Sequence, residues 1–292
     1  MRRLIVGIVL LVAASGTGSQ TQASARNFLW VVARDGAPPS YLLGSLHVLT
    51  PEYYPLSPRI EAAFAGSTVL IQEVDLEELA NPATVLSVAA KAMLPEGTTL
   101  DQLVPRELYA QVLERAAKAG VPAAALQRMK PWMAALSLTT PAMQAAGFKG
   151  EHGVDRHFYE RAREAGMSRR ALETVAFQFD RLDGMAAQDQ EALLRSTLED
   201  LDAQIANVKT IAAAWARGDT AELERELLGS FKEWPRLYQR MLVERNVSWV
   251  PAVERCLQER VSCFVVVGAA HLVGPDSLVA LLQAKGYRVD QH

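Results

Sequence analysis

The sequence has little of several features that mark specialised proteins. Its 292 residues include two cysteines and five histidines, and the net charge is −3. It contains no basic stripe with interleaved aromatics and no low-complexity tract, so the composition gives no reason to expect nucleic acid as a partner. Half of the residues are apolar, which is ordinary for a globular protein.

Several familiar catalytic motifs are also absent from the sequence. It has no G-x-S-x-G nucleophile elbow and no H-E-x-x-H zinc motif, and it lacks the P-loop and the dinucleotide-binding G-x-G-x-x-G. The chain therefore does not match the usual serine hydrolases, zinc proteases, P-loop nucleotidases or dinucleotide-dependent enzymes. A catalytic site has to be sought in other arrangements of residues.

An apolar run that approaches membrane-spanning length occurs only at the N-terminus. Two arginines precede a short apolar core, Leu4–Ala14, and the small residues Ala23–Ala25 form an A-x-A cleavage site. This order predicts a signal peptide over residues 1–25 and an exported mature chain, periplasmic or secreted, with no membrane span after cleavage. The alternative is an uncleaved membrane anchor.

The two cysteines, Cys256 and Cys263, lie seven residues apart where a helical pattern passes into an apolar strand. In an oxidising compartment they are placed to form a disulfide around that turn. The alternative is a pair of buried free thiols, and the sequence leaves both open. Without a second pair of cysteines they make a poor metal site.

Strand patterns lie mostly at the two ends of the chain, and helical patterns fill its middle. The patterns predict strands over residues 28–33, 40–46, 68–75, 168–174, 262–271 and 287–292. They predict helices, separated by Pro or Gly, over 57–67, 82–93, 105–119, 123–129, 131–146, 154–165, 175–183, 187–216, 219–228, 235–260 and 274–286. The sequence thus predicts an α/β (α+β) fold in one domain, residues 26–292. Its central mixed sheet comes from both chain ends, and a large helical insertion covers about 76–240.

The two ends share one pattern. "YLLGSLHVLT" ends an apolar strand with Gly44 and places His47 three residues later, and "VVVGAAHLVG" does the same with Gly268 and His271. In each unit a loop, a short helix, a glycine and a strand follow. Both histidines fall just past the carboxyl ends of their strands, where open α/β sheets bind ligands. We therefore expect the two histidines to meet at one edge of the sheet.

Histidine at a strand end offers an imidazole nitrogen, the commonest protein ligand for metals. Two histidines and a carboxylate make a site that leaves a coordination position open for water. Glu73 ends the strand that follows the first G-x-x-H unit and is the best carboxylate, with Asp75 in reserve. The alternative is that His47 and His271 only cap strand ends through hydrogen bonds.

Other polar residues have weaker patterns. Glu173 ends the short strand at "RRALET", where it either joins the site or is a solvated loop residue. Arg245 is either placed to bind a carboxylate or oxyanion, or lies on a helix surface. Asp155 begins a helix and is interpreted as an N-cap. His152 and His157 lack the spacing of a helical metal pair and are interpreted as surface or packing residues.

In combination, these motifs resemble the TraB/PrgY/GumN family, and its GumN-like bacterial members in particular. The resemblance covers about residues 28–290. It rests on "LWVVARDGAPPSYLLGSLHVL", "LIQEVDL", "HGVDRHFYERAREAG", "ALET", "RN" and "VVVGAAHLVGPDSLVALLQAKGYRV". The family includes the Tiki metalloproteases, and erythromycin-esterase-like proteins are more distant relatives.

The resemblance implies an α/β fold with a helical insertion and a site near the paired histidines. It places His47, Glu73, Arg245 and His271 in that site, and it adds Glu173 through "LET". It also implies an exported metal-dependent hydrolase, a peptidase. His47, His271 and Glu73 would hold a Mn, Co or Zn ion, Glu173 or Glu73 would act as general base, and Arg245 would stabilise an oxyanion.

Two other functions remain open on the sequence alone. A non-catalytic periplasmic protein would use the same residues to bind a peptide or another ligand without turnover. An ester or lactone hydrolase is suggested by fold-level analogy with the distant relatives. The expected partner is accordingly a peptide or a small molecule. The pattern gives neither the metal nor the oligomeric state.

Overall fold

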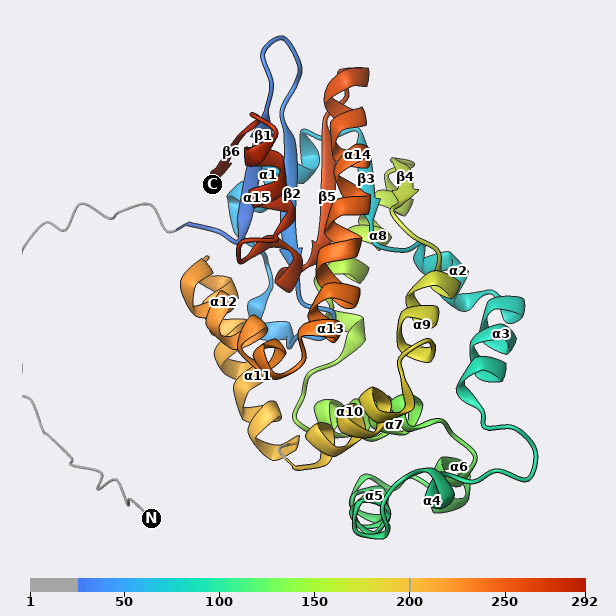
Figure 1. Cartoon of the computed structure of the whole chain (residues 1–292). Helices are drawn as coiled ribbons and strands as arrows, with labels where there is room; N and C mark the ends of the chain where they lie inside the picture. The colour runs from blue at the N-terminus through green and yellow to red at the C-terminus, as the bar shows by residue number, and fades with distance from the viewer. Residues whose placement is uncertain (1–25, 200) are drawn as a thin grey trace, which may run out of the picture.

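The computed structural model describes residues 26–199 and 201–292 and contains a six-stranded mixed sheet (Figure 1). The predicted signal peptide lies outside the described residues. The predicted mixed α/β class is confirmed. The strands lie in the order β4-β3-β5-β2-β1-β6. Their bounds are β1 Leu29–Ala33, β2 Ser40–Ser45, β3 Val69–Gln72, β4 Ser168–Ala171, β5 Cys263–Gly268 and β6 Arg288–Gln291.

The four strands β4, β3, β5 and β2 are parallel, whereas β1 and β6 pair antiparallel at one side. In the pairing of β2 with β5, Gly44 lies opposite Val267 and Ser45 opposite Gly268. The two G-x-x-H glycines are therefore staggered by one residue on neighbouring parallel strands. Both histidine loops leave the sheet at the same edge, as the sequence pattern predicts.

Helices cover both faces of the sheet. Helices α14 (Glu244–Glu259) and α15 (Leu278–Ala284) lie on one face, and α1 (Pro58–Ala65) and α8 (Val154–Glu164) lie on the other (Figure 1). Phe264 of β5 packs against Phe64 of α1 and Phe158 of α8 at ring-centroid distances of 5.4 and 4.8 Å. Burial on both faces explains why β3 and β5 are buried at every residue and are mostly apolar rather than alternating.

The helical insertion extends beyond the carboxyl ends of the strands (Figure 1). It has a buried cluster of its own, which includes Leu108, Leu126 and Leu138 and is separate from the core around the sheet. Besides α8, its helices are α2 Leu76–Ala80, α3 Pro82–Ala92, α4 Leu100–Leu103, α5 Arg106–Ala119, α6 Ala123–Gln127, α7 Pro131–Ala145, α9 Val175–Asp183, α10 Ala187–Glu199, α11 Leu201–Ala216, α12 Thr220–Leu228 and α13 Pro235–Tyr238.

A disulfide joins Cys256 of α14 to Cys263 of β5, and both residues are fully buried. The sequence left this pair open between a disulfide and free thiols. Of the two alternatives, the structure has the disulfide around the helix-to-strand turn. Within residues 26–199 and 201–292, we find no helix with the length and apolar character that a membrane crossing requires.

Candidate active site

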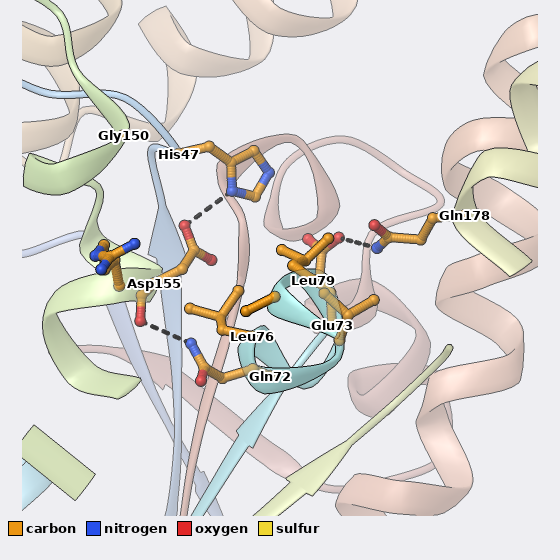
Figure 2. Close-up of a pocket in the computed structure, with 11 residues that line it drawn as sticks. His47, Gln72, Glu73, Leu76, Leu79, Gly150, Asp155 and Gln178 are labelled. Atoms are coloured by element: carbon orange, nitrogen blue, oxygen red, sulfur yellow. Dashed lines mark hydrogen bonds and ion pairs between the residues drawn. The ribbon is translucent and has the colours of Figure 1, made fainter. Parts of the chain in front are cut away.

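A pocket of about 530 Å³ lies at the carboxyl ends of β2 and β3, between the sheet and the helical insertion. His47 and Asp155 line one side, and Glu73 and Gln178 line another (Figure 2). His47 follows β2 and Glu73 follows β3, the two parallel strands on either side of β5, so both side chains reach the same edge of the sheet. Glu73 also contacts a buried network behind the pocket wall.

Arg245 is the centre of that buried network. Its Nη2 donates to Glu73 Oε2 at 2.7 Å and to Glu173 Oε2 at 2.9 Å, and its Nε donates to Glu173 Oε1 at 3.0 Å. The three side chains are 7%, 9% and 4% exposed. One guanidinium therefore forms ion pairs with two carboxylates that have left water, and its planar group of five donors can reach both at once.

Three neighbouring groups donate further hydrogen bonds to the two carboxylates. Gln178 Nε2 donates to Glu73 Oε2 at 3.0 Å and to Glu173 Oε2 at 3.4 Å, and Trp249 Nε1 donates to Glu173 Oε1 at 3.0 Å. The backbone N–H of Gly268 donates to Glu73 Oε1 at 2.7 Å. Both carboxylates are thus held by several donors, which fixes their orientation.

His271 is buried and its ring is held at both nitrogens. Asn246 Nδ2 donates to the Asp276 carbonyl at 2.8 Å, so Asn246 Oδ1 is the atom that faces His271 Nδ1, at 2.6 Å. An amide oxygen only accepts, so Nδ1 carries the proton of the neutral ring. The lone pair on Nε2 faces Arg245 Nη1, 3.2 Å away. The ring also packs against Trp249 with a centroid distance of 4.4 Å.

His47 is also held at Nδ1, but its acceptor is a carboxylate rather than an amide oxygen. Its Nδ1 lies 2.8 Å from Asp155 Oδ2, so Nδ1 donates to a carboxylate (Figure 2). Asp155 is fixed in turn by Ser45 Oγ, which donates to its Oδ1 at 2.8 Å, and by Gln72 Nε2, which donates to its backbone oxygen at 2.8 Å. The remaining nitrogen, Nε2, is left to face the pocket. A carboxylate on the far ring nitrogen is the partner that metal-binding histidines commonly have.

The groups converge on Gly268. A methyl group at this position would lie 3.2 Å from Glu73 Oε1, 3.5 Å from His47 Nε2 and 3.6 Å from His271 Cδ2. At the first glycine, Gly44, it would lie 2.2 Å from the ring of Phe28. Both glycines of the repeated pattern are therefore explained by close approach: Gly44 lets Phe28 pack, and Gly268 leaves room for the polar groups.

The charges in the network set the protonation of Glu73 and His271. Burial alone would raise the pKa of Glu73, but His271, His47, Arg245 and the Gly268 N–H outweigh it and lower this pKa to about 2. Burial, aided by the charge of Arg245, lowers the pKa of His271 to about 3, although Glu73 opposes this. At neutral pH His271 is uncharged, so the positive charges of His47 and Arg245 keep Glu73 ionised.

The charge of Asp155 has the opposite effect on His47 and raises its pKa to about 10. The side chain is 65% exposed, so solvent screens part of this attraction. Because Nδ1 is held by Asp155, the proton that His47 gains and loses is the one on Nε2, the nitrogen that faces the pocket.

Replacing Asp155 with asparagine is therefore expected to lower the pKa of His47 toward its ordinary value of 6.5. The main cause of the rise is removed, while the asparagine oxygen still accepts from Nδ1. The measurement is an NMR titration of the carbon-bound imidazole protons in the wild type and in Asp155→Asn. His157, whose pKa is lowered mainly by burial, is the internal reference and keeps its value. A His47 pKa that is unchanged in the variant contradicts the assignment.

The structure brings together the predicted residues Glu73, Glu173, Arg245 and His271 in one network, with His47 across the pocket. Of the alternatives left open for the two weaker candidates, a solvated loop for Glu173 and a helix surface for Arg245 do not hold, since both side chains are buried. The reserve carboxylate Asp75 instead caps α2, where it accepts from Glu77 N at 3.0 Å.

The interpretation of Asp155 as a plain N-cap is wrong. The N-cap of α8 is Gly153, and the Asp155 carboxylate turns to His47 and Ser45 instead. Gln178 and Trp249 were not predicted at all. Asn246 appears in the "RN" pair, but its contact with His271 could not be read from the sequence. Asp155, Gln178, Trp249 and Asn246 all act through contacts with residues distant in the chain.

The donor types fit a divalent ion, because imidazole and carboxylate suit Mn, Co and Zn. In the part of the chain that the structure describes, however, no three His, Cys, Asp or Glu side chains form a group placed to hold a metal ion. The guanidinium of Arg245 contacts both Glu73 and His271, and so bridges the two predicted buried ligands. An ion shared by these residues requires Arg245 to release them.

The sequence profile of the TraB/PrgY/gumN family matches residues 28–291, which covers the sheet, the insertion and every residue of the site. The chain belongs to this family. Metalloprotease TIKI2 of Danio rerio is 24% identical over an alignment that covers 92% of this chain and 62% of that protein. The uncharacterized protein YbaP of Escherichia coli (strain K12) is 22% identical, covering 83% of this chain and 87% of YbaP.

Higher identity is confined to shorter stretches. Metalloprotease TIKI1 of Danio rerio is 36% identical, but the alignment covers 32% of this chain and 19% of that protein. The chain spans less than two thirds of the length of the TIKI relatives it matches. No solved structure matches the chain significantly. Family membership and the fold therefore rest on the profile and on this structure.

Proposed function

We propose that this member of the TraB/PrgY/gumN family is an exported metal-dependent hydrolase that cleaves peptides. One observation carries the proposal. Both G-x-x-H histidines have Nδ1 held by an acceptor, Asp155 or Asn246, and both rings lie beside Gly268 next to the Glu73 carboxylate. Relatives named as metalloproteases and the pocket of about 530 Å³ beside Glu73 support the choice of reaction. The A-x-A pattern and the buried disulfide support export.

His47, His271 and Glu73 would hold the ion, which suits Mn, Co or Zn. When bound, the ion supplies a Lewis acid that lowers the pKa of water and polarises a carbonyl. Asp155 and Asn246 keep the Nδ1 proton on each ring and so leave each Nε2 for binding. The Nε2 proton of His47 competes for that position, so binding is expected to strengthen as pH rises.

The remaining residues have roles in the peptide reaction. Glu173 is the proposed general base, or Glu73 where it does not bind the ion. Arg245 contacts both carboxylates and, once it leaves Glu73, is placed to stabilise an oxyanion or to orient a substrate carboxylate. The pocket beside Glu73 is where the scissile bond would lie.

The test is the metal content of the mature chain, purified without chelator, loaded separately with Mn, Co and Zn and measured by elemental mass spectrometry. The expected result is about one ion per chain at a saturable site. We expect His47→Ala and His271→Ala each to lose it, because each removes one of three protein ligands. His152→Ala is the matched control, since its side chain contacts Glu151 outside the site, and it should keep the ion.

Wild-type protein that stays empty with all three metals contradicts the metal-dependent reaction. A second candidate is then hydrolysis without a metal, with His47 as general base. The observation that favours it is the arrangement of Arg245, which already pairs with Glu73 and Glu173 and donates to His271 Nε2. In that reaction the exposed His47–Asp155 pair activates water once His47 has lost its Nε2 proton, so the rate should rise with pH, and Arg245 stabilises the oxyanion.

A further inference from the structure

A second pocket, of about 380 Å³, lies between α3 and α9 in the helical insertion. The two helices run side by side (Figure 1), and Lys91 of α3 forms an ion pair with Asp180 of α9. None of the described residues that line the pocket is charged. They include Val85, Val88, Met93, Met129, Met133 and Phe179. We call this pocket the α3–α9 groove.

The groove leaves apolar side chains in water. Val85 is 51% exposed and Met93 38%, and α3 buries only Ala92 although most of its residues are apolar. An apolar face that the fold itself does not cover is characteristic of a binding site. Its volume lies within the range of pockets that hold small ligands.

The groove adjoins the catalytic pocket. Leu79 of α2 lines both cavities. On α9, Gln178 reaches Glu73 in the catalytic pocket, and its neighbour Phe179 lines the groove. Successive helical residues point in directions about 100° apart, so one turn of α9 serves both cavities. A molecule extending from Glu73 past Leu79 enters the groove without leaving the protein surface.

We propose that the α3–α9 groove is a specificity subsite that takes a bulky apolar side chain of the peptide whose backbone lies in the catalytic pocket. The proposal rests on the peptidase function proposed above. A charged or strongly polar side chain would lose its hydration in the groove without gaining a partner. Three flexible methionines, Met93, Met129 and Met133, adapt to different shapes, so we expect Leu, Phe and Met to be accepted alike.

The experiment measures binding rather than cleavage, so that it can be read even where no peptide is hydrolysed. Full-length mature protein carrying His47→Ala is incubated with a pooled library of decapeptides, and bound peptides are identified by affinity selection and mass spectrometry. The pool contains matched peptides with Leu, Phe or Met against Ser, Asn or Gly. Burying one such side chain is expected to enrich apolar peptides roughly tenfold.

Two exposed residues of α3 give a matched pair of variants. Val85 lines the groove, and Leu86, 71% exposed, does not. In the same background, Val85→Asp is expected to lose the apolar enrichment and Leu86→Asp to keep it. Thermal unfolding should show the two variants to be equally folded. Equal enrichment in both variants, or no enrichment with the intact groove, overturns the proposal.

Cleavage by the protein with His47 intact is assayed separately on the same pool. Apolar enrichment that depends on Val85, together with no cleavage under any metal condition, rejects the peptidase function and leaves the groove as a site that binds apolar side chains. Cleavage without a preference for apolar side chains supports the peptidase function and rejects the α3–α9 groove as its specificity subsite.

Discussion

Arg245→Met is expected to lower the free energy of unfolding by about 3–5 kcal/mol, the usual cost of leaving one side of a buried ion pair without its partner. Methionine fills much of the same space but supplies neither charge nor donors. Glu73 and Glu173, each less than a tenth exposed, would then lie close together with no buried cation between them. The measurement is urea unfolding at pH 7.

Two comparisons test the physical reason. Arg170→Met removes an ion pair with Glu259 in which both side chains are more than a third exposed, and it should cost less than about 1 kcal/mol. Adding Glu173→Gln to Arg245→Met removes one of the two repelling charges, so part of the lost stability should return. A loss in Arg245→Met as small as that in Arg170→Met would show that the buried charges are not what Arg245 stabilises.

The sign of the pH dependence follows from Glu73. With Arg245 present, its folded pKa of about 2 lies below the ordinary 4.5. Its stabilising contribution is therefore complete above pH 4.5 and is lost as pH falls toward 2. In Arg245→Met the effect of burial on Glu73 is no longer offset by the guanidinium, so its pKa rises. The deficit of the variant should accordingly shrink as pH falls and the carboxylate takes up a proton.

His47→Ala is expected to reduce peptide hydrolysis about 10²–10⁴-fold, the contribution typical of a general acid–base group. The loss is expected in both proposed mechanisms, because His47 is a ligand in one and the base in the other. The fold should survive, since the side chain is 65% exposed and contributes little to the core. The assay follows product formation from a pooled peptide library by mass spectrometry.

His152→Ala is the control for this assay. It removes another partly exposed histidine, whose carbonyl rather than its ring accepts from Tyr54. Rates within a few-fold of wild type for His152→Ala, with a large loss for His47→Ala, support the assignment. If His47→Ala were as active as the control, His47 would have no part in the chemistry.

The sequence contains much of the information about the sheet and part of that about the site. The strands at both chain ends are predicted because apolar, β-branched runs and a D-G turn are local features. The G-x-x-H repeats are also local, and parallel pairing of β2 with β5 is enough to bring them to one edge. For this reason His47, Glu73 and His271 could be proposed before their contacts were known.

Other residues of the site have no local signal. Asp155 lies 108 residues from His47, and a carboxylate in the first turn of a helix has the same pattern whether it caps the helix or orients a histidine. Gln178 lies in an ordinary amphipathic helix, and only the tertiary placement of α9 brings its amide to Glu73. Such contacts depend on how the insertion packs on the sheet, which periodicity does not specify.

The structure also differs from the predicted helix in the segment before Arg245. The pattern predicts one helix over 235–260, whereas the structure has α13, a π-helical turn at Gln239–Val243 and then α14. The Met241 carbonyl, inside that turn, accepts from Arg245 Nη1 at 3.2 Å. Over so short a segment, hydropathy periodicity does not distinguish a π-helical turn from an α-helical one, so the turn is not predicted from the sequence. Turns of this kind are frequent at functional sites.

Helix α14 and strand β5 are connected at both of their ends, by the disulfide at one end and by the site at the other. From Arg245 to Cys256, α14 rises about 16 Å. From Cys263 to Gly268, β5 rises about the same 16 Å. The covalent bond joins the two elements at one end, and Glu73 joins them at the other by accepting from both Arg245 and Gly268. Adding or removing one residue within α14 would shift Arg245 by about 1.5 Å and rotate it by about 100° relative to the disulfide. The length of this helix is therefore fixed by the site, and substitutions along it should be tolerated far better than insertions or deletions.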